Sequence, residues 1–257
     1  MAKLTYIDVE TSPNRGTFWR PGYKVNLSAD NIEQERVLLS ASWVHDDDED
    51  IYYSDALEWK KAPKDSPYKW ELDDTQICKD IFEGLAESTV MVHHNGNSFD
   101  MPWINGRCLI NGLPTLPQFR NIDTYRVAKR QYNLNSYRLD YLTKLLGVSE
   151  EGKLHTNYQL WLDVMAGDEE AYNYMVEYNI EDVRILREVY KKLRPGMSGI
   201  VWANLVDDEN SACPHCEQNH KKLHKRGTVP NKSTFYYRYF CSECGTWSRS
   251  ANKRYPK

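Results

Sequence analysis

The chain has 257 residues, of which 40% are hydrophobic and 12% aromatic, enough for one full hydrophobic core and a small second module. No apolar run approaches the ~20 residues of a membrane-spanning helix, which excludes a helical membrane protein. Residues 3–9 are strand-like and lack the basic and long apolar regions of a signal peptide, so we expect a cytoplasmic protein.

The net charge of −4 conceals an uneven distribution of charge. Residues 210–257 contain ten Lys or Arg and two Glu, a net charge of +8, whereas the preceding residues contain 23 Lys or Arg and 35 Asp or Glu, a net charge of −12. The basic segment can attract polyanions such as nucleic acid. The acidic remainder would repel them unless metal ions intervene.

Hydrophobic periodicity and turn residues predict an alternation of strands and helices. The predicted elements are, in order, strands over residues 3–9, 37–45 and 51–54, a helix over 73–87, a strand over 89–93, a helix over 98–110, a strand ending at 121–124, and helices over 125–131, 139–146, 158–165 and 169–193. The acidic residues 46–50 are expected to form a solvated hairpin turn. This order indicates one α/β domain, which we place at residues 1–197, followed by a linker and a cysteine-bearing module at 198–257.

Four acidic residues stand in three separated motifs. Asp8 and Glu10 belong to Y-I-D-V-E-T, Asp100 to H-N-G-N-S-F-D, and Asp182 to Y-N-I-E-D. Asp8 and Glu10 share one face of a predicted strand, and Tyr178 and Asp182 share one face of a predicted helix. Carboxylates without basic neighbours stay partly protonated or hold cations, and all-oxygen ligands suit Mg²⁺ or Mn²⁺. Spacing alone leaves a second interpretation open, in which these are surface acids and a core tyrosine.

These motifs, in this order, resemble those of the DEDD-type 3′–5′ exonucleases, which include the proofreading domains of DNA polymerases. The resemblance covers roughly residues 1–195 and includes the stretch from I-D-T-Y-R-V-A to N-S-Y-R-L-D-Y-L-T-K-L-L-G-V. One branch of the family has a histidine at the position of Glu177, whereas the other has a tyrosine at the position of Tyr178, so the chain resembles the tyrosine branch. The resemblance implies an α/β fold with a ribonuclease H-like mixed sheet flanked by helices. The pattern is most similar to stand-alone exonucleases predicted in bacteriophage genomes, which would place the protein in the host cytoplasm.

The resemblance also implies a mechanism and a set of site residues. Two Mg²⁺ or Mn²⁺ ions would flank the scissile phosphate and would be held by Asp8, Glu10, Asp100 and Asp182. Tyr178 would orient the attacking water, and hydrolysis would release nucleoside 5′-monophosphates from single-stranded or frayed DNA. RNA is a second candidate substrate, because no residue of the sequence is identified as one that would distinguish RNA from DNA by its 2′-hydroxyl. A replication or repair protein is a candidate partner. The residues expected to contact the substrate are Asn95, Phe99, Arg138, Lys153 and Trp19.

The C-terminal module contains two C-x-x-C pairs, Cys213 with Cys216 and Cys241 with Cys244. In a reducing compartment clustered cysteines are expected to hold metal, and two such pairs can place four thiolates around one structural Zn²⁺. The module resembles a zinc ribbon, a small β-structure in which residues 234–240 would supply a strand. Two redox-active thiol pairs are the alternative, but the sequence lacks a thioredoxin-like βαβ context.

Basic residues in this module alternate with aromatic ones, a composition that suits phosphate pairing and base stacking on single-stranded nucleic acid. The other interpretation is that the aromatic residues wrap the zinc as a small core. For the whole chain, two alternatives to a 3′–5′ exonuclease stay open. One is a catalytically inactive nuclease-fold zinc protein that binds nucleic acid or recruits a partner, and the other is a structure-specific endonuclease.

Overall fold

The computed structural model describes residues 3–17, 28–56, 60–61, 70–71, 73–117, 119–149, 154, 156–197, 212–213, 220–231, 234–243, 245 and 247–250. Within these residues every predicted strand and helix is present, with ends shifted by at most three residues. No helix in the described part of the chain has the length and apolar character needed to cross a bilayer.

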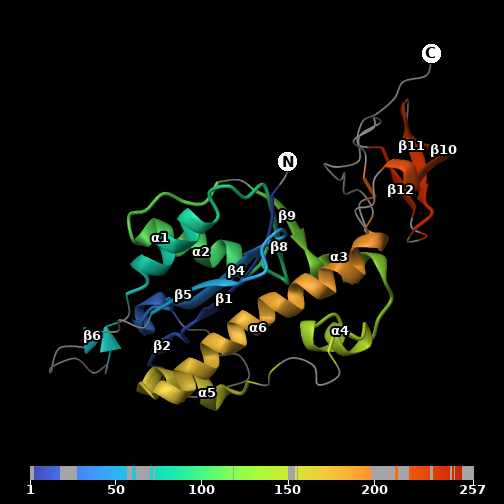
Figure 1. Cartoon of the computed structure of the whole chain (residues 1–257). Coiled ribbons are helices and arrows are strands. Elements are labelled where there is room, and N and C mark those ends of the chain that lie inside the picture. The colour runs from blue at the N-terminus through green and yellow to red at the C-terminus, as the bar shows by residue number, and fades with distance from the viewer. Residues whose placement is uncertain are drawn as a thin grey trace.

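The central sheet has five strands in the order β5-β4-β1-β8-β9 (Figure 1). These strands are β1 Leu4–Thr11, β4 Leu38–His45, β5 Tyr52–Asp55, β8 Val90–His93 and β9 Arg120–Asp123. β1 pairs antiparallel with β4 and parallel with β8, while β8 pairs parallel with β9. The expected mixed sheet is therefore confirmed, and the antiparallel pairing of β4 with β5 confirms the predicted hairpin.

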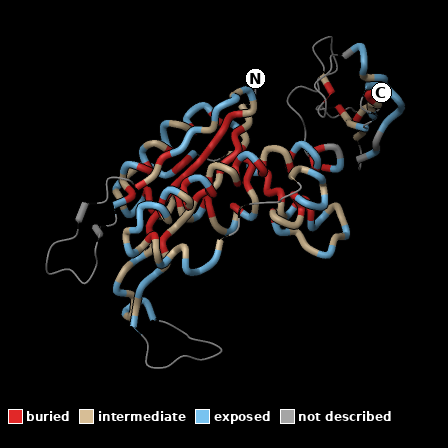
Figure 2. The backbone as a smooth tube through the Cα atoms, turned by 60° about the horizontal axis from the view of Figure 1, so that its bottom comes forward, coloured by how far each residue is buried: buried red, intermediate tan, exposed pale blue. Residues whose placement is uncertain are grey.

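Helices cover both faces of this sheet (Figure 1). The helices are α1 Thr75–Gly84, α2 Asp100–Ile110, α3 Thr124–Gln131, α4 Leu139–Leu145, α5 Tyr158–Ala166 and α6 Glu169–Leu193. Because side chains alternate along a strand, Ile7 and Val9 of β1 pack in the hydrophobic cluster of α1 and α2, whereas Tyr6 packs in the cluster of α3, α4 and α6. Figure 2 shows the strands buried between these two helical layers.

Short elements lie outside this framework. Two two-stranded pairings join β2 Arg15–Gly16 to β3 Ile32–Gln34 and β6 Lys60–Lys61 to β7 Trp70–Glu71. Three 3₁₀ turns span Ala29–Asn31, Arg194–Gly196 and His220–Lys222. Runs of two or three residues are too short for periodicity to predict them.

The described part of the C-terminal module is a three-stranded antiparallel sheet in the order β10-β11-β12. Its strands are β10 Leu223–Asn231, β11 Thr234–Cys241 and β12 Trp247–Arg249. The predicted strand at 234–240 is therefore confirmed. Cys213 and Cys241 are buried, whereas Cys216 and Cys244 lie outside the described residues.

Candidate active site

Helix α6 brings one acidic residue onto the strand that carries two others. Its N-terminus is capped by Asp168, whose Oδ1 accepts a hydrogen bond of 3.0 Å from the Ala171 N–H, and acidic residues in the first turn and lysines in the last match the helix dipole. Its apolar stripe packs on the face of the sheet that also carries Asp8 and Glu10. The capping stabilises the helix itself, and the apolar stripe holds it against the sheet.

The three carboxylates of β1 and α6 converge. One oxygen each from Asp8, Glu10 and Asp182 lie within 4.8 Å of one another. Asp182 is only 3% exposed, and Asp8 and Glu10 are half-buried. Three carboxylates this close repel one another unless protons or cations intervene. The geometry and the oxygen-only ligand set fit hard divalent cations.

Asp100, from the second motif, contacts the backbone of the same strand, β1. It begins helix α2 and is 2% exposed, and its Oδ1 accepts a hydrogen bond of 3.1 Å from the N–H of Val9, the residue between Asp8 and Glu10. Burial raises the pKa of Asp100 to about 7. The backbone N–H groups of Val9 and Asp100 oppose this shift, and the negative charge of Asp182 adds to it. Four carboxylates from three motifs therefore meet around β1.

The turn before Asp100 is built for close packing. Asn95 adopts a left-handed conformation with φ of 64°. Gly96 follows it, and a Cβ at that position would lie 2.5 Å from His93 Cγ and 2.7 Å from Asp100 Oδ2. Only glycine therefore fits without displacing the Asp100 carboxylate. Asp123 holds the turn by accepting a hydrogen bond of 3.0 Å from the Asn95 N–H.

A fully buried amide that sequence reasoning did not single out fixes Asp8. Asn179 is 0% exposed, and its Nδ2 donates a hydrogen bond of 2.8 Å to Asp8 Oδ2. Its Oδ1 accepts hydrogen bonds from Ser40 and Ser42 of β4, at 3.0 and 2.8 Å. Ser42 and Ser40 stand opposite Asp8 and Glu10 in the β1–β4 register, so the serines share their face of the sheet. The serine hydroxyls fix which way the amide points, and the amide in turn orients the carboxylate.

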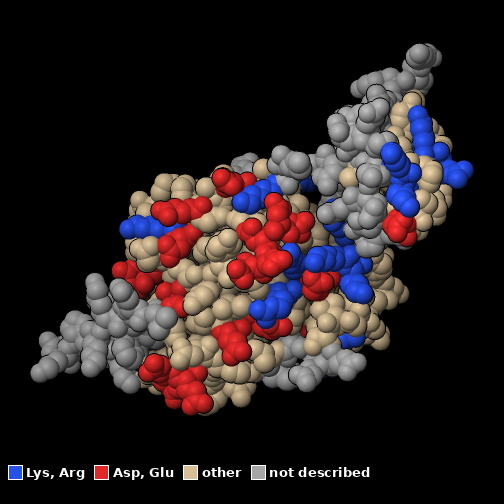
Figure 3. All heavy atoms as spheres, viewed as in Figure 1, with Lys and Arg blue, Asp and Glu red and all other residues tan. Residues whose placement is uncertain are grey.

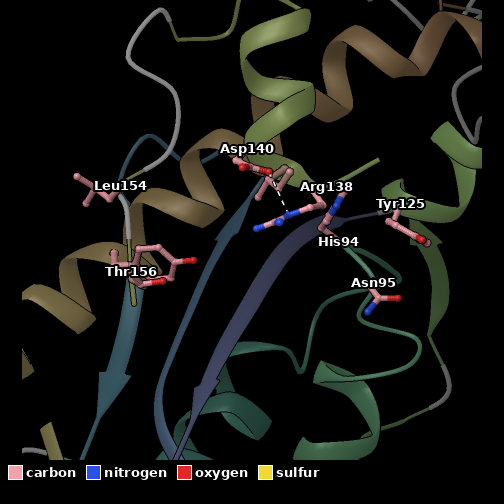
Figure 4. Close-up of a pocket in the computed structure, with 9 residues that line it drawn as sticks. His94, Asn95, Tyr125, Arg138, Asp140, Leu154 and Thr156 are labelled. Atoms are coloured by element: carbon pink, nitrogen blue, oxygen red, sulfur yellow. Dashed lines mark ion pairs between the residues drawn. The ribbon is translucent and has the colours of Figure 1, made fainter. Parts of the chain in front are cut away.

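A pocket of about 460 Å³ adjoins this constellation (Figure 4). Its lining residues are His94, Asn95, Tyr125, Arg138, Leu139, Asp140, Leu154, Thr156 and Tyr178. In Figure 4, Leu154 and Thr156 lie across the pocket from His94, Tyr125 and Asn95. Tyr178 stands one turn before Asp182 on α6, so the pocket extends to the helix that carries one of the three converging carboxylates.

The predicted substrate contacts fall into three groups. Asn95 and Arg138 line the pocket, where the exposed Arg138 forms an ion pair of 3.5 Å with Asp140. Phe99 packs instead beside Trp103 against the hydrophobic cluster of α1 and α2, with ring centroids 6.5 Å apart. Trp19 and Lys153 lie outside the described residues. A contact of any of them with substrate stays a prediction.

Residues 33–194 match the family described as the RNase_H superfamily. The chain belongs to the RNase H superfamily. This match contains Asp100, Tyr178 and Asp182, and it ends one residue beyond α6. It confirms the ribonuclease H-like fold expected from the motifs.

Two further similarities connect this RNase H superfamily chain to DNA polymerases. It is 22% identical over 187 residues to a DNA polymerase of Methanocaldococcus jannaschii, an alignment that covers 64% of this chain and 11% of the polymerase. A solved family B DNA polymerase from the archaeon Pyrobaculum calidifontis superposes with a TM-score of 0.53 at 18% identity, over 76% of this chain and 25% of that chain. The chain thus spans a small part of each polymerase, and the structural likeness is one of fold.

Proposed function

We propose that the chain is a metal-dependent 3′–5′ exonuclease of the tyrosine branch, phage-encoded and cytoplasmic, that acts on single-stranded or frayed DNA. The observation that carries this proposal is the meeting of Asp8, Glu10 and Asp182 within 4.8 Å, with Asp100 hydrogen-bonded to the backbone between the first two. The similarity to two DNA polymerases supports it, because such enzymes carry proofreading exonucleases in the family that the motifs resemble.

The carboxylates would hold two Mg²⁺ or Mn²⁺ ions. Asp8, Glu10 and Asp182 would hold one ion, and Asp8 and Asp100 would help to hold the second. Bound ions would supply Lewis acidity at the scissile phosphate and would balance the charge on the attacking and leaving oxygens. The buried Asp100, whose pKa is about 7 without cations, fits this role because a nearby cation favours its ionised form.

The other residues of the site would bind and orient the reactants. Tyr178 lines the pocket, and its hydroxyl can both donate and accept a hydrogen bond, which suits it to orient the attacking water. Asn95 and Arg138 would contact the terminal nucleotide and its phosphate from the same pocket. Phe99, Trp19 and Lys153 complete the proposed contacts. The water oxygen would bond to phosphorus as the water gives up a proton. The P–O3′ bond would break and the 3′-oxygen would take up a proton, so a nucleoside 5′-monophosphate would leave the new 3′-hydroxyl end.

The C-terminal module, residues 198–257 with the linker, would be a zinc ribbon that binds nucleic acid. Cys213 and Cys241 are 1% and 0% exposed, as expected for thiolates enclosed around a structural metal. With Cys216 and Cys244 they would complete four sulfur ligands. Zinc content measured by atomic absorption, with one equivalent expected and Cys241→Ser as the test variant, checks this assignment.

Labelled oligonucleotides test the nuclease directly. Single-stranded DNA and RNA, each labelled at the 3′ or the 5′ end, are incubated with Mg²⁺, Mn²⁺ or EDTA. We expect 5′-labelled DNA to shorten stepwise and 3′-labelled DNA to release one labelled nucleotide at once, only with metal. Asp182→Asn should abolish this, whereas Glu188→Gln, which removes an exposed acid from the same helix, should not. Cleavage of circular DNA would instead establish an endonuclease, and no cleavage of any substrate by the folded protein would establish the inactive alternative.

A further inference from the structure

One face of the C-terminal sheet gathers arginines and aromatic rings. Side chains alternate along a strand, so Tyr236, Arg238 and Phe240 of β11 point to the same side. The register places Arg249 of β12 opposite Arg238, and Trp247 opposite Phe240. We call these five side chains the cationic face.

The charged and aromatic groups of the cationic face stack on one another. The Arg249 guanidinium lies 4.2 Å from the ring centre of Tyr236, and that of Arg238 lies 4.7 Å from the ring centre of Trp247. Phe240 packs beside Trp247, with ring centroids 5.2 Å apart. Trp247 is nevertheless 51% exposed, so an indole held in place by two neighbours still offers much of its surface to solvent.

Among the described residues, no carboxylate balances the positive charge of this face. Arg238 and Arg249 stand directly opposite each other, an arrangement in which like charges destabilise a sheet. Neither forms an ion pair with a carboxylate among the residues that the structure describes, and the nearby Glu243 is paired with Lys222 at 3.0 Å. In Figure 3 lysines and arginines gather over the described part of this module, while acidic residues spread over the α/β domain. An anion placed between the two guanidinium groups would relieve their repulsion.

We infer that the cationic face binds single-stranded nucleic acid, with phosphates on Arg238 and Arg249 and an unstacked base on Trp247. A single strand combines the two chemistries that this face offers, because its phosphates repeat along the chain and its bases are free to stack on an aromatic ring. In a duplex the bases are stacked on one another and would leave Trp247 without a partner. The inference rests on the nucleic-acid-binding role proposed above for the C-terminal module and names the face that carries it. The binding is distinct from hydrolysis, so loss of binding and loss of cleavage can be measured separately.

The opposite face of the same sheet supplies a matched comparison. Lys225 of β10 lies 3.1 Å from the ring centre of Tyr237, and both point away from the cationic face. That side has one stacked cation in place of two, and it also carries the buried Cys241. A variant of Lys225 therefore changes charge and cation–aromatic stacking in the same small sheet without touching the proposed binding residues.

Fluorescence anisotropy of the full chain tests the inference. A labelled 20-nucleotide oligothymidine is titrated without added Mg²⁺ or Mn²⁺ into proteins that carry Asp182→Ala to prevent hydrolysis, over a series of KCl concentrations. Trp247→Ala should weaken binding on the order of tenfold, and Trp247→Phe should restore most of the affinity, because a phenyl ring also stacks. Arg238→Gln with Arg249→Gln should weaken binding at least tenfold and reduce the slope of log K against log salt by about 1.4, as the loss of two phosphate contacts requires.

Three results would overturn the inference. The first is a loss with Lys225→Gln as large as that with Arg238→Gln or Arg249→Gln, since it would mean that net charge alone matters. The second is equal or tighter binding to a duplex of the same length, and the third is a preference for anionic phospholipid vesicles over the oligonucleotide. Arg238→Lys keeps the sheet's charge and serves as the variant that distinguishes misfolding from loss of contact. It should retain the salt dependence while it lowers affinity.

Discussion

Replacing Asn179 with leucine separates the role of its hydrogen bonds from that of its shape. Leucine has the same branching as asparagine, so Asn179→Leu fills the same buried space but gives no donor to Asp8 and no acceptor to Ser40 and Ser42. A hydrogen bond to a charged group contributes about 1.5–3 kcal/mol. Since Asp8 is half-buried and partly solvated, we take the lower part of this range, about 1.5–2 kcal/mol, which corresponds to roughly 10- to 30-fold.

The assay measures the property that the amide is expected to control. Mn²⁺ affinity, determined by isothermal titration calorimetry without nucleic acid, should fall roughly 10- to 30-fold in Asn179→Leu, and kcat for a labelled oligonucleotide should fall with it. KM should stay within about twofold, because Asn179 does not line the substrate pocket. Asn105→Leu is the matched control. It removes an amide that accepts a hydrogen bond of 2.9 Å from the Leu116 N–H, and it should lower the melting temperature without changing Mn²⁺ affinity.

A folded Asn179→Leu protein with native Mn²⁺ affinity would refute this reasoning. It would show that Asp8 is held well enough by the strand itself. A proportional loss in Asn105→Leu would refute it as well, because the effect would then follow stability rather than the orientation of one carboxylate.

Three other perturbations have expected outcomes. The buried Arg107 forms an ion pair of 2.7 Å with Asp74, and Asp74→Ala would leave it without a counter-charge at a cost of about 3–5 kcal/mol. The melting temperature should therefore fall on the order of 10 °C. A decrease of less than about 2 °C, measured by differential scanning calorimetry, would contradict this. Gly96→Ala should weaken Mn²⁺ binding at least tenfold, because the added Cβ would push against the Asp100 carboxylate. Gly106→Ala is the control, since its Cβ would meet nothing within 4 Å, and it should leave the affinity unchanged. Equal Mn²⁺ affinities for the two variants would exclude a packing role for the turn at Gly96. Because the folded protein raises the pKa of Asp100 from 3.8 to about 7, it binds a proton that the unfolded chain has released, so metal-free stability should fall as pH rises from 4 to 7. Chemical denaturation should show this fall in stability for the parent protein and no such fall for Asp100→Asn. The same pH dependence in that variant would show that Asp100 is not the group with the raised pKa.

The local parts of the site could be predicted from sequence because they follow fixed periods. Two residues along a strand return to the same face, which places Asp8 beside Glu10, and four residues along a helix do the same for Tyr178 and Asp182. The structure places each pair on the predicted element, and the family match confirms the fold that the motif order implied.

The contacts across elements could not be predicted in this way. Asn179 reaches Asp8 over a separation of 171 residues, and this depends on how β1, β4 and α6 are aligned, which no local pattern specifies. Phe99 shows the opposite case, since a residue inside a sequence motif packs against the hydrophobic cluster of α1 and α2. A motif predicts which segment contributes to the site, but the packing of the fold determines which side chains of that segment are accessible to substrate.

The packing of α6, a helix late in the sequence, against the first strand has a consequence for folding during synthesis. Contacts between residues so far apart in sequence close a long loop, and such contacts form slowly and only when the intervening elements are in place. A growing polypeptide that has emerged from the ribosome as far as β9 has Asp8, Glu10 and Asp100 but not the acid on α6. The carboxylate centre is therefore completed only when nearly the whole α/β domain has been synthesised, so partly made chains near nucleic acid lack one of its three converging ligands.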